Sequence, residues 1–418
     1  MKFNTHSTTP PHWILSCILA LSIALSFTSC SDGSSGGSDD DSEQVTNSKA
    51  TYTVTFDANG GSGTIESITE IVGTEITLPE STFTKDGYIF AGWNTKDDGT
   101  GTNYADKAKI TVTADITLYA KWTLTAAGAP GLIRALPDDG ETHTVSISGD
   151  MTADDFTALK EVLYGKKVCL DLSATTITEI PSNAFSNASN DCRGLAGIVL
   201  PASVEKIGNK AFYKSELETV IIPKSDTAVT IGANAFASSE LKSIAIPGNV
   251  KAISTYAFSS CQKLASVVIE EGVQSIENQA FSNCRVLKSV TIPSTVIEIG
   301  QYAFIGCNAL ESTVVNSKTT GDSMFHQCTA LKEVTLGTEV KTLTGYTFSY
   351  CSSLETVNIL TNELSIGDCA FYECTVLKNV RIAGSETDCK ITSSSLAGGN
   401  NSFDSAEKIY NYDFSQSN

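Results

Sequence analysis

Histidine is scarce in this sequence, with four residues in a chain of 418. The two outside the N-terminal region, His143 and His326, stand in unrelated contexts that offer no catalytic neighbours. The chain also lacks an H-E-x-x-H pair, a P-loop, and a G-x-S-x-G elbow between a predicted strand and a predicted helix. We therefore expect a protein that is not an enzyme and that needs no cofactor and no metal ion.

Positive charge is also in short supply. The chain has 28 Lys and Arg residues against 47 Asp and Glu residues, which gives a formal net charge of −19 and a pI of about 4.6. Such a chain repels phosphate backbones, sulphated polysaccharides and anionic lipid headgroups. Nucleic acid is therefore not expected as a partner.

No apolar run at the N-terminus is long enough to cross a membrane. The uncharged stretch from Trp13 to Phe27 is about 15 residues long, whereas a spanning helix needs about 20. Its position after Lys2 is typical of an export signal, which we assign to residues 1–29. The residues just before Cys30 resemble a bacterial lipoprotein box, which implies cleavage before Cys30 and lipidation of its thiol. An ordinary secretory signal followed by a chance cysteine is the alternative.

The segment after Cys30 has the composition of a spacer. Residues 31–43 are Ser, Gly, Asp and Glu only, without an aliphatic or aromatic side chain. Such a sequence cannot bury a core, so residues 30–50 are predicted to form a flexible acidic tether. Its aspartates lack the spaced ligands of a calcium-binding loop. Lipid and tether together would hold a folded body at a cell envelope.

Residues 51–123 are predicted to form a small β module. Tyr52, Val54 and Phe56 alternate as in a strand, and the glycines after Asn59 supply a turn. The strings from Gly87 to Trp93 and from Thr117 to Trp122 add two aromatic clusters, and together the three motifs resemble the internalin-type B repeat, a β-grasp-like module of bacterial surface proteins. Its rings, Tyr88, Phe90, Trp93 and Trp122, are interpreted as core rather than as a sugar-stacking platform.

A repeat with a period of 21 to 27 residues occupies the rest of the chain. Each unit has a phenylalanine at the same place, usually followed by Leu-x-x-Val-x-Ile. The marker residues are Phe185, Phe212, Phe236, Phe258, Phe281, Phe304, Phe325, Phe348 and Phe371. This period predicts a leucine-rich-repeat solenoid of about nine coils, in which each coil adds a short strand to a parallel sheet. The fold class is therefore mainly β, with short helical or irregular segments and the solenoid over residues 168–383.

The ends of the solenoid are predicted to be capped. Residues 124–167 should contain a linker followed by a helix, because Thr152 and Asp155 form an N-terminal capping pair and Phe156 and Leu159 recur at helical spacing. The first strand is expected at residues 168–172. Residues 384–418 look like a degenerate last coil and a C-terminal cap.

Cysteine recurs at one position of the repeat, three residues before the leucine and, from Phe258 on, three residues after the phenylalanine. The members of this cysteine ladder are Cys192, Cys261, Cys284, Cys307, Cys328, Cys351 and Cys374. Stacked residues lie about 5 Å apart, within disulfide reach, but ideal stacking points neighbouring Cβ atoms in parallel. We favour buried thiols that donate to turn carbonyl groups over disulfides or a metal site.

The Ala-Phe-x-x-Cys-x-x-Leu-x-x-Val-x-Ile-Pro unit resembles the BspA-like leucine-rich-repeat family of bacterial surface proteins. That resemblance implies a cell-surface lipoprotein that is exposed on the outer surface and attaches to extracellular matrix, host cells or other bacteria. Three departures are evident, namely an insertion in the Phe185 coil, a short Phe304 coil and Thr313 in place of valine.

Side chains between the buried residues of each strand should project outward and form a repeated strip on the sheet. We call this set the strip, and its members are Thr219, Ile221, Ser243, Ala245, Ser266, Val268, Ser289, Thr291, Glu333, Thr335, Thr356, Asn358, Asn379 and Arg381. Small and mostly neutral side chains fit a broad contact with a protein ligand better than a deep pocket. The alternatives are that these residues only reflect strand propensity, and that the protein is a non-adhesive envelope scaffold. The ligand and the oligomeric state stay open.

Overall fold

The computed structural model describes residues 49–188, 192–393 and 401–416. The predicted export signal, the lipidation of Cys30 and nearly all of the tether fall outside the described residues. Residues 50–418 are described below as one unit.

The N-terminal module is a small mixed β fold, as the sequence predicts. Its main sheet has the order β2-β1-β7-β4-β5, and β3 pairs with β6 in a separate antiparallel ribbon. The strands are β1 Thr51–Asp57, β2 Ile68–Ile71, β3 Glu75–Thr77, β4 Tyr88–Asn94, β5 Asn103–Tyr104, β6 Lys109–Thr111 and β7 Ile116–Leu124. The first and last long strands, β1 and β7, run parallel, whereas β2, β4 and β5 pair antiparallel with their neighbours.

The aromatic rings of this module form its core. Trp93 is 0% exposed, and Phe56, Phe83 and Phe90 lie around it with ring centroids 4.9 to 5.8 Å from its own. Trp122 is half-buried and donates from Nε1 to the Ala58 carbonyl at 2.9 Å. In a domain this small these rings are the main apolar volume, which agrees with their interpretation as core.

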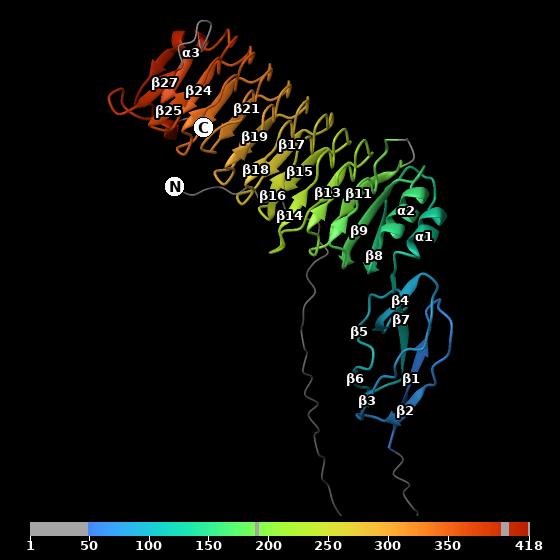
Figure 1. The fold of residues 1–418 in the computed structure, drawn as a ribbon. Helices are drawn as coiled ribbons and strands as arrows, with labels where there is room; N and C mark the ends of the chain where they lie inside the picture. The colour runs from blue at the N-terminus through green and yellow to red at the C-terminus, as the bar shows by residue number, and fades with distance from the viewer. Residues whose placement is uncertain (1–48, 189–191, 394–400, 417–418) are drawn as a thin grey trace, which may run out of the picture. The chain divides into compact units, whose positions relative to one another are not determined.

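A parallel sheet, which we call the first sheet, runs along one side of the solenoid (Figure 1). Its hydrogen-bonded ladders have the orders β13-β11-β9-β8, β15-β17 and β19-β21-β22-β24-β26-β28. The strands are β8 His143–Gly149, β9 Val168–Thr175, β11 Leu195–Val199, β13 Thr219–Ile221, β15 Ser243–Ile246, β17 Ser266–Ile269, β19 Ser289–Ile292, β21 Ser312–Val315, β22 Glu333–Leu336, β24 Thr356–Ile359, β26 Asn379–Ile382 and β28 Glu407–Ile409.

Most coils also contribute a strand to a second parallel sheet, which the repeat pattern as interpreted above does not predict. Its ladders are β10-β12-β14-β16-β18-β20 and β23-β25-β27. The strands are β10 Glu179–Ile180, β12 Lys206–Ile207, β14 Val229–Ile231, β16 Val250–Ile253, β18 Ser275–Ile276, β20 Glu298–Ile299, β23 Thr342–Leu343, β25 Glu363–Ile366 and β27 Lys390–Ser393. The available signal is the pair of apolar residues before each Ala-Phe, such as Val250 and Ile253, which are both fully buried.

The marker phenylalanines stack inside the solenoid as a continuous ladder. The rings of Phe258 and Phe281 lie 5.0 Å apart and within 5° of parallel, and the neighbouring pairs are similar. The ladder continues beyond the repeat, because Phe156 packs edge-on against Phe185 and Phe403 stacks on Phe371 at 5.1 Å. With these end coils the solenoid has about eleven turns.

The N-terminal cap is more ordered than the sequence indicates. Helix α2, Ala153–Val162, begins as predicted, and the Asp155 carboxylate accepts from the Thr152 amide at 2.7 Å. The stretch expected to be a linker, however, holds helix α1, Ala129–Ala135, and strand β8, which pairs with β9. Pro130 at the start of α1 and the buried alternating Val145 and Ile147 are the signals that identify these elements.

The C-terminal segment closes the stack at the other end. Helix α3, Asn401–Ser405, is followed by β28, which pairs in parallel with β26, and by the short 3₁₀ helix η1, Phe414–Gln416. The last coil is therefore degenerate in sequence but continues the first sheet.

The short Phe304 coil interrupts the second sheet. Between β20 and β23 the only pairing among the described residues is an isolated bridge from Thr319 to Thr342. Ile297 is left 63% exposed beside this gap. In the same coil Thr313 occupies the inward valine position, and its hydroxyl donates to the Val290 carbonyl at 3.0 Å, which satisfies the buried polar group.

Candidate functional site

The strip lies on the outward face of the first sheet, and its residues are in register wherever consecutive strands are paired. Ser243 is paired with Ser266, and Ala245 with Val268. Their neighbours Ile244 and Ile246 point inward and are buried. The period of two along each strand therefore separates core from surface, as the sequence predicts.

The N-terminal and central part of the strip is open to solvent. Its exposed members are Thr219, Ile221, Ser243, Ala245, Ser266, Val268, Ser289 and Thr291. Two apolar side chains stand among these small residues, with Ile221 57% and Val268 52% exposed. The surface can therefore offer both apolar contact and hydroxyl groups without a deep pocket.

The C-terminal part of the strip differs from the prediction. Thr356 and Asn358 are buried, at 9% and 6% exposure, and Thr335, Asn379 and Arg381 are half-buried. These side chains are therefore not freely available to a ligand.

The cause is a hydrogen-bonded network across three strands. Asn358 Nδ2 donates to Glu333 Oε1 at 2.6 Å and to Thr335 Oγ1 at 3.2 Å. Arg381 reaches over Asn358, with Nη1 3.8 Å from Glu333 Oε1 and its guanidinium carbon 4.8 Å from the Tyr412 ring centroid. Sequence position alone cannot reveal this, because the partners belong to different coils.

The sequence analysis also missed one pair of outward residues. Ser312 and Val314 of β21 are in register with Ser289 and Thr291 of β19. Ser312 is exposed and Val314 is half-buried. Their spacing from Phe304 is the same as in the Phe258 and Phe281 coils, so the repeat itself could have identified them.

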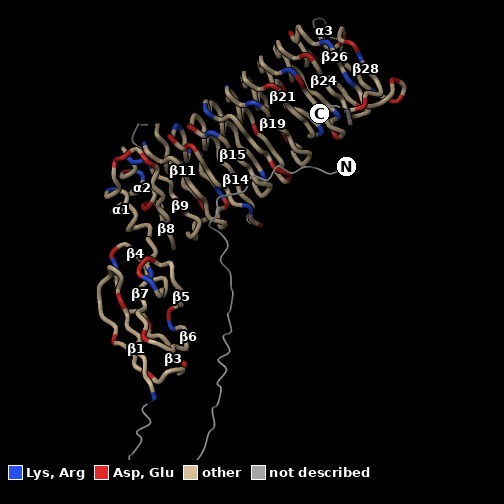
Figure 2. Tube along the Cα trace, turned by 180° about the vertical axis from the view of Figure 1, so that it is seen from behind, with Lys and Arg blue, Asp and Glu red and all other residues tan. Residues whose placement is uncertain are grey.

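A row of charged residues borders the strip, just before most of the strands that carry it (Figure 2). Glu218 pairs with Lys242, and Glu311 lies 3.2 Å from Lys288 and 3.9 Å from Lys332. The Lys242 ammonium group lowers the pKa of Glu218. Because these pairs are exposed, each contributes at most about 1 kcal/mol to stability, and the row presents alternating charge to a ligand.

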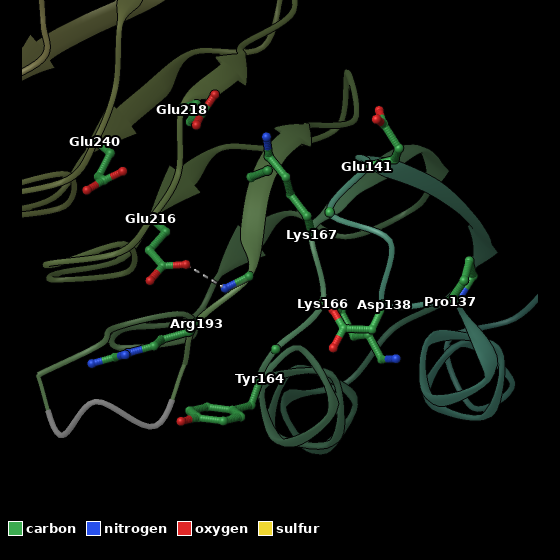
Figure 3. Close-up of a pocket in the computed structure, with 14 residues that line it drawn as sticks. Pro137, Asp138, Glu141, Tyr164, Lys166, Lys167, Arg193, Glu216, Glu218 and Glu240 are labelled. Atoms are coloured by element: carbon green, nitrogen blue, oxygen red, sulfur yellow. Dashed lines mark hydrogen bonds between the residues drawn. The ribbon is translucent and has the colours of Figure 1, made fainter.

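A hollow of about 390 Å³ lies at the N-terminal end of this row (Figure 3). Its wall combines basic and acidic side chains, among them Lys167, Arg193, Glu216, Glu218 and Glu240. The Gly194 amide donates to Glu216 at 3.1 Å, which fixes that carboxylate on the wall. Such mixed charge suits a polar loop of a protein ligand. The sequence alone does not predict the hollow, because its wall combines the cap with residues from several coils.

The cysteine ladder is buried in the coil interior. Cys284 Sγ donates to the Phe258 carbonyl at 3.2 Å, and Cys261, Cys307, Cys328, Cys351 and Cys374 make the same bond to the phenylalanine of the preceding coil, at 3.1 to 3.3 Å. Burial raises the pKa of Cys261 to about 11 and that of Cys374 to about 12. Cys192, at the N-terminal end of the ladder, is also buried.

His143 and His326 contact different partners. His143 Nε2 lies 3.0 Å from Asp139 Oδ1, and His326 Nδ1 lies 2.6 Å from Ser349 Oγ. Partial burial lowers the pKa of His326. Among residues 49–188, 192–393 and 401–416, no cluster of His, Cys, Asp or Glu could hold a metal ion.

Over the same part of the chain, none of the helices combines the length and the apolar character that crossing a bilayer requires.

Comparisons with known proteins identify both repeat types. Residues 178–311 and 313–418 match the BspA type leucine-rich repeat region, and residues 52–121 match the Listeria-Bacteroides repeat domain. A Gly-rich membrane protein of Evansella cellulosilytica is 38% identical over 77 residues, which is 18% of this chain and 9% of that protein. The chain thus spans only a small fraction of that relative's length.

Solved bacterial leucine-rich-repeat structures are similar over the solenoid. One from Bacteroides ovatus is 26% identical, with a TM-score of 0.45, over 63% of this chain and 66% of that one. One from T. pallidum is 27% identical, with a TM-score of 0.35, over 44% of this chain and 80% of that one. The pneumococcal vaccine antigen PcpA is 20% identical, with a TM-score of 0.37, over 62% of this chain and 85% of that one.

Leucine-rich-repeat proteins generally mediate protein interactions, and BspA-like members are typically found at the cell surface. Because the family match covers more than half of its residues, this chain belongs to the BspA-type leucine-rich-repeat proteins, with a Listeria-Bacteroides repeat domain ahead of the solenoid.

Proposed function

We propose that this protein is a lipid-anchored adhesin of the bacterial cell envelope, without enzymatic activity, that binds a protein ligand through the open part of the strip. The ligand belongs to the extracellular matrix, to a host cell or to another bacterium. One observation carries the proposal, which is that small and apolar side chains from successive coils lie exposed between Thr219 and Thr291, with those of β15 and β17 in register.

Two apolar residues give this surface its expected anchors. Ile221 and Val268 are more than half exposed although they stand on a regular sheet. Exposed apolar side chains surrounded by small polar ones are typical of protein contact surfaces, and a few such residues usually dominate the binding energy. The alternating charges beside the strip and the hollow at its N-terminal end supply the polar rim.

The export signal and Cys30 support the proposed location. A lipid on Cys30 and an acidic tether up to residue 50 would keep the binding face accessible above a membrane. Outer-surface exposure follows from the proposed attachment to external ligands.

Binding of the full chain to immobilised fibronectin, fibrinogen and epithelial cells tests this function. The double variant Ile221→Ser/Val268→Ser, which we call the strip variant, removes both apolar anchors. We expect its affinity for the immobilised ligand to be at least about 10-fold lower than that of the parent chain. Ile297→Ser is the matched control, because Ile297 is 63% exposed on the other side of the coil, near the gap in the second sheet.

Saturable binding that survives Ile297→Ser and is lost in the strip variant supports an adhesin. If the folded parent chain binds none of these surfaces, the host-ligand proposal is wrong and the protein is better described as an envelope scaffold.

A further inference from the structure

The turn around each marker phenylalanine forms a second repeated surface, distinct from the strip. We call the residues from two before to two after each of these phenylalanines the Phe ridge. Its first and last residues adopt left-handed backbone conformations, as in Tyr346 at φ 55° and Tyr350 at φ 60°. This conformation favours Gly and Asn and is uncommon for bulky residues. The chain itself uses Asn234, Asn283 and Gly306 at such positions.

Tyrosine nevertheless occupies four of these strained positions. Tyr256, Tyr302, Tyr346 and Tyr350 have positive φ and are 36% to 47% exposed. An aromatic ring there has a conformational cost, and much of its surface still faces water. Folding stability alone therefore does not account for these rings.

One of these rings, Tyr350, belongs to a continuous cluster of three rings in the C-terminal coils. Tyr350 lies between His326 and Tyr372, with centroid distances of 5.3 and 5.5 Å and interplanar angles of 76° and 78°. These edge-on contacts link the Tyr350 ring to rings of the coils before and after it. The result is an aromatic surface on successive turns rather than isolated side chains.

The charge of the ridge changes along the solenoid. Around Phe212, Lys210 and Lys214 place their ammonium groups 5.9 and 5.4 Å from the Tyr213 ring centroid. In the C-terminal coils the ridge and the residues that flank it, over segments 301–309, 322–330, 345–353 and 368–376, contain no Lys or Arg. They do contain acidic side chains, with Asp322 and Glu373 exposed.

We propose that the Phe ridge around Tyr346, Tyr350 and Tyr372 is a second binding surface, which takes an extended protein segment rich in Lys and Arg. The faces of the phenol rings attract cations, and the neighbouring carboxylates match the charge of the segment. In the Phe212 coil the chain's own Lys210 and Lys214 lie beside the Tyr213 ring. This contact illustrates the one that a cationic side chain of a ligand would make with the tyrosines.

The test variant copies residues that the chain already uses at equivalent turns. Tyr346→Asn and Tyr350→Asn reproduce Asn234 and Asn283, and Tyr372→Ser reproduces Ser282. This triple variant should fold, which its far-ultraviolet circular dichroism and thermal unfolding will show. The matched control is Tyr213→Ser, the same change at the equivalent position of an N-terminal coil.

Binding of a labelled arginine-glycine peptide to the full chain is measured by fluorescence anisotropy at about 150 mM salt, where non-specific attraction is screened. We expect the triple variant to bind at least about 10-fold more weakly, because two or more exposed cation–π contacts are lost. Tyr213→Ser and the strip variant should bind within twofold of the parent chain. The strip variant thus separates this surface from the proposed adhesin face.

Equal affinities of the parent and triple variants would overturn the proposal and assign the attraction to the net charge of the chain. The same conclusion follows if Tyr213→Ser weakens binding as much as the triple variant does. Binding of a chitin oligosaccharide that depends on the tyrosines, with no binding of the peptide, would replace the proposal with a sugar-stacking surface.

Discussion

The Cys284 thiol donates a hydrogen bond to the main-chain carbonyl of Phe258, one coil earlier in the stack, at 3.2 Å. Both groups are shielded from water, and the bond gives the Phe258 carbonyl a second donor besides the Cys261 amide, which lies 3.4 Å away. The cysteine ladder thus joins consecutive coils through side chain and backbone together.

Cys284→Ala is expected to lower the free energy of unfolding by about 1–3 kcal/mol, because it removes buried volume and one of the two donors to the Phe258 carbonyl. Urea unfolding followed by circular dichroism measures the change. Cys389→Ala serves as the control, since Cys389 is half-buried near the C-terminal end and a smaller effect is expected there. Equal losses in the two variants would contradict a specific role for the ladder.

The ladder thiols should be unreactive in the folded chain. Burial raises the pKa of Cys261 from its usual 9.0 to about 11, so at pH 8 it holds its proton and is shielded from reagents. A thiol-reactive chromophore at pH 8 should modify the half-buried Cys169 and Cys389 first, and the ladder only after urea is added. Rapid modification of Cys261 in the native chain would show that the coil opens locally.

The same shifts predict how stability depends on pH. Above pH 9 the unfolded chain loses thiol protons that the folded chain keeps, since the folded-state pKa of Cys374 is about 12. The unfolded state then binds fewer protons, so the free energy of unfolding is unaffected by these groups below about pH 8 and falls as the pH rises from 9 toward 12. Thermal unfolding at pH 8 and pH 10 measures this, and a replacement of Cys261 by Ser should reduce the slope.

Glu333→Ala should disturb the C-terminal part of the strip. The change removes the acceptor at 2.6 Å from the buried Asn358 amide and the carboxylate near Arg381, so we expect a loss of about 1 kcal/mol in unfolding free energy. Glu339→Ala, at an exposed residue of the same coil, is the control in the same urea titration. A variant as stable as the control would mean that the network contributes no net stability.

Cys30→Ser tests the proposed anchor. Expressed with its signal in a bacterial host, the parent chain should incorporate labelled fatty acid and sediment with membranes, whereas the variant should do neither. Export of the parent chain without the label would identify an ordinary secretory signal instead.

The repeat pattern predicted most of the solenoid. The spacing of the phenylalanines, the inward pairs such as Val290 and Ile292, and the cysteine position all have the structural roles expected of them. These roles are local properties of one coil, repeated, so a single sequence shows them several times. The sequence pattern did not predict the second sheet, because its strands are only two to four residues long. An alternation of apolar and polar residues this brief cannot be recognised.

The candidate site was predicted less completely than the fold. Outward positions such as Ser243 and Val268 follow from strand alternation alone, and they are exposed. Burial of Asn358 does not follow, because it depends on Glu333 and Arg381 from the neighbouring strands. The hollow beside Glu216 likewise requires the cap and several coils to be placed together.

The sequence by itself determined the repeat, its period, the inward and outward positions and the capping helix α2, since each depends on neighbours within about one coil of chain. Only the tertiary structure decided which outward side chains remain accessible and which rings gather on the Phe ridge. Those properties arise from contacts between residues about 23 positions apart, such as Tyr350 and Tyr372, whose identities vary from coil to coil and whose distances are set by stacking.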